Sequence, residues 1–190
     1  MRPTETLMKE ITCIRKALDI LSCICGKIEK GDKVNHLDLH RVINFFNTFV
    51  DQCHNKKEEE ILFPEIDELG QKDHEQTIHD LKSDNELGRF YTELLSKACD
   101  RMKSGNKMAG QQLVDVSKKY IQLESEHLDK EIRYIFPICQ EKFSEDMKTR
   151  LTEEFNQMED KKFGAGQHES FHDAMEQMID RMAGTYLNAS

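Results

Sequence analysis

The sequence predicts an all-α protein, namely an up-down-up-down four-helix bundle with a C-terminal helical extension. Helix-forming residues dominate, whereas the 190 residues include only three prolines and no tryptophan. Apolar residues recur at steps of three and four, and no stretch shows sustained alternation of β-branched residues. Short polar breaks divide the first 142 residues into four long segments of this kind. Together these features favour long amphipathic helices joined by short connections.

The first two helices are predicted on either side of the polar stretch KGDKVN at 30–35. The second should begin at His36 or Leu37 and run toward Pro64, with Ile43, Phe46 and Val50 facing the core. The first helix has one apolar face, made by Leu7, Ile11, Ile14, Leu18, Leu21, Cys25 and Ile28.

The third and fourth helices are expected over residues 74–103 and 108–139. The polar stretches ELGQKD (68–73) and SGNK (104–107) separate them from their neighbours. Two more helices, over 144–160 and 166–185, are expected around the break FGAG at 163–166. We therefore expect a bundle at 1–142 and a helical extension at 143–190 that packs on it.

Charge and cysteine usage exclude several classes of function. The net charge of −9 disfavours nucleic-acid binding, which requires a positive surface. No apolar run is long enough to span a membrane, so no membrane association is expected. The six cysteines form no CxxC pair, and the N-terminus lacks the apolar region of a secretory signal. We expect reduced, mostly buried thiols and a cytoplasmic location.

One phrase occurs twice in the chain. Residues 54–64 read HNKKEEEILFP and residues 127–137 read HLDKEIRYIFP, so His, Glu, an aliphatic residue and Phe-Pro recur 73 positions apart. At an offset of 74, LMKEITCIRKALDIL (7–21) also matches LKSDNELGRFYTELL (81–95), with Glu10 opposite Asp84. The chain therefore reads as two copies of a helical hairpin. Such a bundle has a pseudo-twofold axis, and a site on that axis takes equivalent residues from both halves.

The repeated phrase predicts a metal site. His54 and Glu58 lie four residues apart on the apolar face of the second helix, and His127 and Glu131 do the same on the fourth. A buried carboxylate is costly unless it is paired or binds a metal. A nitrogen and oxygen donor set suits iron or manganese, and zinc less specifically. The alternative is that each pair is an exposed i, i+4 pair in a solvated face such as KKEEE (56–60), but the repetition favours the metal site.

At this point the chain resembles the hemerythrin-like family of His-His-Glu cation-binding domains. The resemblance rests on three stretches, which are CHNKKEEEILFP (53–64), EHLDKEIRYIFP (126–137) and DNELGRFY (84–91). The tail GAGQHESFHDAMEQM (164–178) also looks like the C-terminal extension of longer members of the family.

The resemblance implies a non-haem iron centre with one or two ions, and O2 or NO as molecules that it handles. Its pattern carries over to four metal ligands, which are His54, Glu58, His127 and Glu131. The family's ligand histidine of the first helix is replaced by Ile11, which cannot coordinate. Asn85 stands at the ligand position of the third helix, where its carbonyl oxygen offers a weaker ligand. The expected centre therefore has a reduced ligand set.

Three functions fit these observations. The first is an iron-binding protein that senses or handles O2, NO or iron, and the second is a metal-free bundle that acts as a structural or interaction protein. The third is a di-metal peroxidase or ferroxidase. Binding is favoured over catalysis because the sequence identifies no substrate, and it identifies no protein partner either.

Two other features carry less chemistry. HESFH (168–172) fits the zinc-protease pattern His-Glu-x-x-His, but no third ligand follows at the usual spacing, so a structural role is favoured. Neither His168 nor His172 is expected to fold back over the bundle. Glu124, one turn before His127, is expected to be either an outer partner of the site or a charge at its rim.

Overall fold

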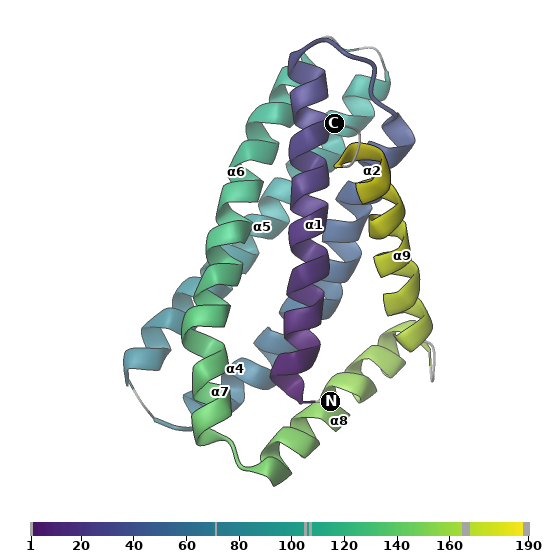
Figure 1. Cartoon of the computed structure of the whole chain (residues 1–190). Helices are drawn as coiled ribbons and strands as arrows, with labels where there is room; N and C mark the ends of the chain where they lie inside the picture. Colours follow the sequence, from purple (N-terminus) through teal and green to yellow (C-terminus); the bar gives the residue numbers. More distant parts are fainter. Residues whose placement is uncertain (1, 71, 105, 107, 165–167, 188–190) are drawn as a thin grey trace.

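The chain folds into four long helical rods and two further helices, with no β-strand in the described residues (Figure 1). The computed structural model describes residues 2–70, 72–104, 106, 108–164 and 168–187. The all-α prediction is therefore confirmed, and consecutive rods of the bundle run antiparallel.

The first two rods begin at local capping signals. The helix α1 (Pro3–Glu29) starts with Pro3 in its first turn, where the missing N–H costs nothing, and Glu5 Oε2 accepts a hydrogen bond from the backbone N–H of Arg2 at 2.9 Å. Asn35 caps the second rod, accepting a hydrogen bond from the backbone N–H of Leu37 at 2.9 Å. This rod spans 36–67 and consists of α2 (His36–Phe45), η1 (Phe46–His54), α3 (Asn55–Lys57), η2 (Glu58–Leu62) and α4 (Phe63–Asp67).

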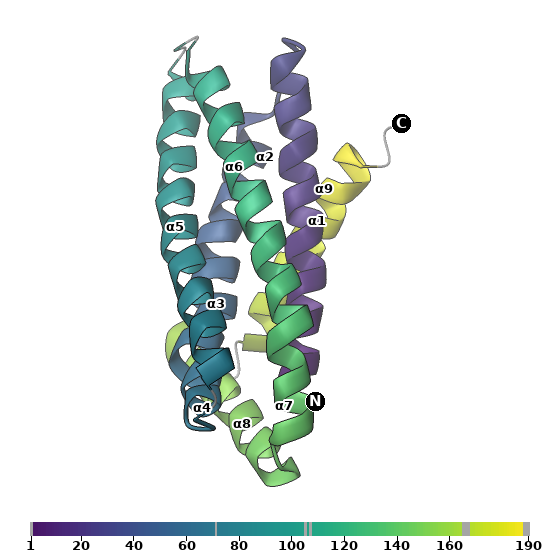
Figure 2. The same ribbon diagram turned by 90° about the vertical axis from the view of Figure 1, so that its left-hand side faces the viewer.

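The third rod is α5 (Lys72–Lys103), and the fourth spans 109–142 as α6 (Ala109–Lys130), η3 (Glu131–Ile135) and α7 (Phe136–Lys142). The helix α5 packs on α6 and α2, and α1 packs on α6 and on the second rod (Figure 2). The apolar faces expected from the sequence meet in one core between the rods.

The segments η1, η2 and η3 are π-helical, so the backbone widens to i to i−5 hydrogen bonds there. Phe63 N–H bonds the carbonyl of Glu58, and Phe136 N–H bonds that of Glu131. Each phenylalanine precedes a proline, which has no N–H to give to the helical ladder and whose ring clashes with the carbonyl four residues earlier. The repeated Phe-Pro thus explains a wide turn that begins at an equivalent glutamate in each half.

The remaining helices are α8 (Glu145–Phe163) and α9 (His168–Tyr186). Both pack on α1, and α9 also contacts α2. The buried side chains of Leu151, Phe155 and Ile179 join the bundle core, and Tyr186 Oη donates to Asp38 Oδ2 at 3.1 Å.

Ser144 caps α8, because its Oγ accepts a hydrogen bond from Met147 N–H at 3.2 Å. We expect Ser144→Ala to lower the free energy of unfolding by about 1 kcal/mol in urea titrations. Thr149→Ala, on an exposed position of the same helix, is the control and should change it by less than about 0.5 kcal/mol. Equal stability of Ser144→Ala and the parent would contradict the capping role.

No helix in the described ranges is both long and apolar enough to cross a membrane. All six cysteines are free, and five are buried while Cys23 is half-buried, as the sequence predicts.

Candidate metal centre

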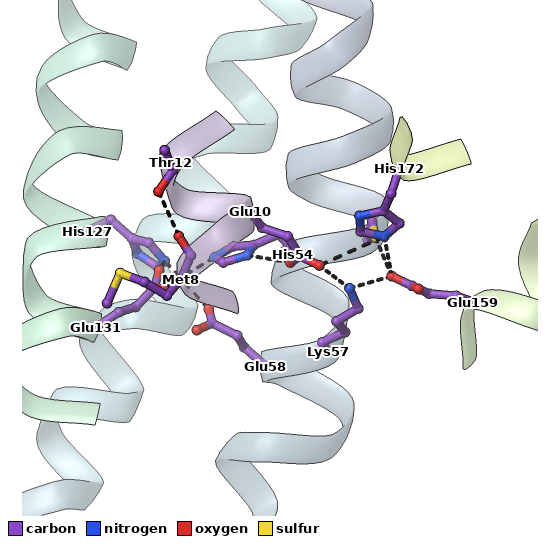
Figure 3. Close-up of polar contacts among 11 residues, drawn as sticks. Met8, Glu10, Thr12, His54, Lys57, Glu58, His127, Glu131, Glu159 and His172 are labelled. Carbon is purple, nitrogen blue, oxygen red and sulfur yellow. Dashed lines mark hydrogen bonds and ion pairs between the residues drawn. The ribbon is translucent and has the colours of Figure 1, made fainter. Parts of the chain in front are cut away.

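The four residues of the repeated phrase meet in the interior of the bundle (Figure 3). His54 ends η1 and Glu58 begins η2, whereas His127 lies in α6 and Glu131 begins η3. Each of the four is at most 1% exposed. Three of them therefore stand at the ends of π-helical turns, which occur often at functional sites.

Glu131 lies between the two imidazoles. Its Oε2 is 3.2 Å from His54 Nε2, and its Oε1 is 2.8 Å from His127 Nε2. His127 Nε2 is in turn 3.8 Å from Glu58 Oε2. One ligand atom each from His54, Glu58 and Glu131 lies within 4.8 Å of the others. This spacing suits donors that share a metal ion.

Several of these buried atoms have no hydrogen-bond partner in the described part of the chain. They are both carboxylate oxygens of Glu58, Oε1 of Glu131, and both ring nitrogens of His127. The 2.8 Å approach of His127 to Glu131 therefore lacks hydrogen-bond geometry. Unsatisfied buried acceptors are costly, and a cation bound among them would satisfy them. The residues present thus fit a metal such as iron.

The two carboxylates have opposite pKa shifts. Burial and the neighbouring Glu131 carboxylate raise the pKa of Glu58 above its ordinary value. Burial also opposes ionisation of Glu131, but His54 and His127 outweigh it and lower its pKa. Burial disfavours the cationic imidazoles, yet the carboxylates around them raise the pKa of both His54 and His127. Without metal the site therefore holds several protons near neutral pH.

A carboxylate from the neighbouring rod stands behind each imidazole. His54 Nδ1 is 2.9 Å from Glu10 Oε2, and His127 Nδ1 is 3.7 Å from Asp84 Oδ2. The Glu10 contact favours a proton on Nδ1 of His54 and leaves Nε2 directed toward the site, whereas 3.7 Å is too long for a hydrogen bond between Asp84 and His127. Glu10 and Asp84 are the pair matched by the internal repeat, so a carboxylate stands behind the imidazole in both halves, but only Glu10 lies within hydrogen-bonding distance.

The two positions that lack the family's histidines have other contacts. Ile11 of α1 is 1% exposed and belongs to the hydrophobic core of the bundle. Asn85 is buried, and its Nδ2 donates to Glu59 Oε1 at 3.0 Å. Its value as a weak ligand stays a prediction. Glu124 is also buried, its Oε1 has no partner in the described residues, and burial raises its pKa, so it is no exposed rim charge.

One expectation about the tail is wrong. His172 does fold back on the bundle, with Nε2 2.9 Å from Glu159 Oε1 and 3.5 Å from Cys53 Sγ. Lys57 is also fully buried, although KKEEE suggested a mostly solvated face. The side chains of His168 and Glu169 lie outside what the structure describes. Lys57 and Lys130 occupy equivalent places in the two phrases, but the repeat does not indicate burial, since the Lys130 side chain is 35% exposed.

Comparison with known proteins agrees with this geometry. Residues 2–139 match the model of the family described as Hemerythrin HHE cation binding domain. The match includes the first three rods, the fourth rod as far as residue 139, and the four residues of the centre. Neither a curated protein nor a solved structure gives a significant match.

Proposed function

Because the chain belongs to the hemerythrin HHE cation-binding domain family, we propose that it binds one or two non-haem iron ions and senses or handles O2, NO or iron. The proposed ligands are His54, Glu58, His127 and Glu131. A bound iron ion would supply Lewis-acid and redox chemistry in a site shielded from water.

The observation that carries the proposal is the pair of buried carboxylates. Glu58 and Glu131 sit next to each other at 0% exposure, and three of their four oxygens have no hydrogen-bond partner in the described chain. Two buried carboxylates this close repel each other unless a proton or a cation lies between them. Family membership implies the cation.

Glu131, Glu10 and Glu58 have different roles in the proposed metal binding. Glu131 is placed to bind metal next to either imidazole, because its two oxygens face His54 and His127 respectively. Glu10 accepts a hydrogen bond from the Nδ1–H group of His54 and so keeps Nε2 directed at the site. Glu58 must release its proton when metal binds, which makes binding dependent on pH.

The second candidate is a metal-free member of the family that acts as a structural or interaction bundle. Ile11 and Asn85 favour it, since two imidazoles are missing from the pattern. A di-metal peroxidase or ferroxidase is the third candidate, because fewer protein ligands leave positions open to a substrate.

Anaerobic reconstitution with iron(II) separates the candidates. We expect one to two iron ions per chain and an increase in Tm of about 5–10 °C at saturating iron, since a ligand that binds only the folded state stabilises it. His54→Ala should abolish both effects, whereas His79→Ala, an exposed histidine on α5, should keep them. A parent protein that takes up no iron would support the metal-free candidate, and peroxide turnover in proportion to bound iron would support the enzyme.

A further inference from the structure

Lys57 is a buried lysine that forms ion pairs with α1 and α8 next to the candidate metal centre. Its ammonium group donates to Glu10 of α1 and to Glu159 of α8, and the side chain is 0% exposed (Figure 3). Glu159 Oε1 also accepts from Cys53 Sγ at 2.7 Å and lies 2.9 Å from His172 Nε2 of α9. The helices α1, α8 and α9 and the second rod therefore meet around Lys57 and Glu159.

The surrounding donors resemble a metal site in their composition. One ligand atom each from Glu10, Cys53, Glu159 and His172 lies within 4.8 Å of the others. The Lys57 ammonium, however, already lies against both carboxylates. Although burial opposes its charge, these carboxylates raise the pKa of Lys57, so it stays protonated. The cluster is a cation site in which the cation is a side chain of the protein.

This cluster continues directly into the proposed iron centre. One oxygen of Glu10 accepts from Lys57 and the other faces His54 Nδ1 at 2.9 Å. His54 Nε2 then faces Glu131 at 3.2 Å. An unbroken series of polar contacts thus runs from His172 of α9 to a carboxylate of the centre.

The other half of the repeat contains the same trio without the extension. Lys130 Nζ donates to Asp84 Oδ2 at 2.7 Å, and Asp84 stands 3.7 Å from His127 Nδ1. There the lysine side chain is 35% exposed and the carboxylate 19% exposed, compared with 0% and 2% for Lys57 and Glu10. The extension therefore covers one of two equivalent outer partners and leaves the other at the surface.

We infer that Lys57, Glu159 and His172 are positioning residues that act through Glu10 to hold His54 in its metal-binding orientation, so that the C-terminal extension makes the centre asymmetric. A metal beside His54 is then held more firmly than one beside His127. The inference rests on the proposed metal binding. It assigns the extension a role in that binding, and it predicts that the two halves respond differently to matched substitutions.

The test compares Lys57→Met with the equivalent Lys130→Met in the full chain, using cobalt(II) as the probe. We expect Lys57→Met and Glu159→Gln to weaken cobalt binding by about 10–100-fold, as loss of an outer partner does in metal sites. In NMR spectra of the cobalt protein, the shifted ring N–H signal of His54 should exchange faster with solvent. Lys130→Met should weaken binding by less than about threefold, because its contact is already exposed to water.

Circular dichroism and hydrogen exchange of α9 establish that each variant is folded. If Lys57→Met does not fold, Glu159→Gln decides, with Glu153→Gln at an exposed position of α8 as its control. Folded variants with parental cobalt affinity and N–H exchange would overturn the inference, as would an equal loss in Lys130→Met. A parent that binds no cobalt or iron refutes the proposed function itself, which is a different result.

Discussion

Glu131→Gln is expected to lower iron(II) affinity by more than 100-fold while the bundle stays folded. Glutamine has the same size but lacks the charge, and the two oxygens of Glu131 lie 3.2 Å and 2.8 Å from Nε2 of His54 and of His127. Loss of a metal ligand should exceed the 10–100-fold that loss of an outer partner typically costs. Isothermal titration with iron(II) under anaerobic conditions measures the change.

The control for this variant is Glu126→Gln, an exposed position on the same rod. It should keep the parental affinity. Parental iron binding by Glu131→Gln would remove Glu131 from the ligand set, and with it the central position that the geometry gives to this carboxylate.

The second large effect is that the stability of the metal-free protein depends on pH. Glu58 has a pKa raised to about 8 in the folded state, whereas its ordinary pKa in the unfolded state is near 4.3. Between these two values the folded state keeps a proton that the unfolded state has lost, so the free energy of unfolding falls as pH rises from about 4.3 to about 8. The raised pKa values of His54 and His127 stabilise the fold fully below about 6.5, and this contribution is lost as pH rises through their folded values. Glu10 and Glu131 have lowered pKa values, and their contribution is lost in acid instead.

Between pH 6 and pH 8 we therefore expect the metal-free protein to lose on the order of 1–3 kcal/mol of stability in urea titrations. Metal affinity should change in the opposite sense and rise about tenfold per pH unit for each proton that metal displaces. The titratable groups that interact with Glu58 are Glu131, the two imidazoles and the thiol of Cys139. Glu58→Gln should show a shallower decline, and a metal-free protein that gains stability from pH 6 to pH 8 would contradict these charge assignments.

The sequence was sufficient to predict the rods and to place the four proposed ligands on apolar helix faces, which the structure brings together; their role as ligands stays a prediction. The spacing of His54 and Glu58 in an apolar stripe, and its repetition at His127 and Glu131, needs no knowledge of tertiary contacts. The wide π turns at these glutamates were harder to predict from the sequence, since only the Phe-Pro pair in each phrase indicates them. They are visible only once the backbone hydrogen bonds are known.

The outer network could not be predicted in the same way. Lys57 looks like a solvated residue within KKEEE, and it is buried because α8 brings Glu159 over it. His172 belongs to a short motif whose spacing suggested another chemistry, and only the packing of α9 on α1 shows its contact with Glu159. Contacts between side chains of different helices leave no periodic signal in one sequence.

The most direct test of the central claim is anomalous scattering at the iron edge from crystals of protein loaded anaerobically with iron(II). We predict one or two peaks within bonding distance of Glu58, Glu131 and the Nε2 atoms of His54 and His127. A protein that binds iron but shows its peak elsewhere, for example among Glu159, His172 and Cys53, would contradict this claim, and so would crystals of iron-treated protein with no peak inside the bundle.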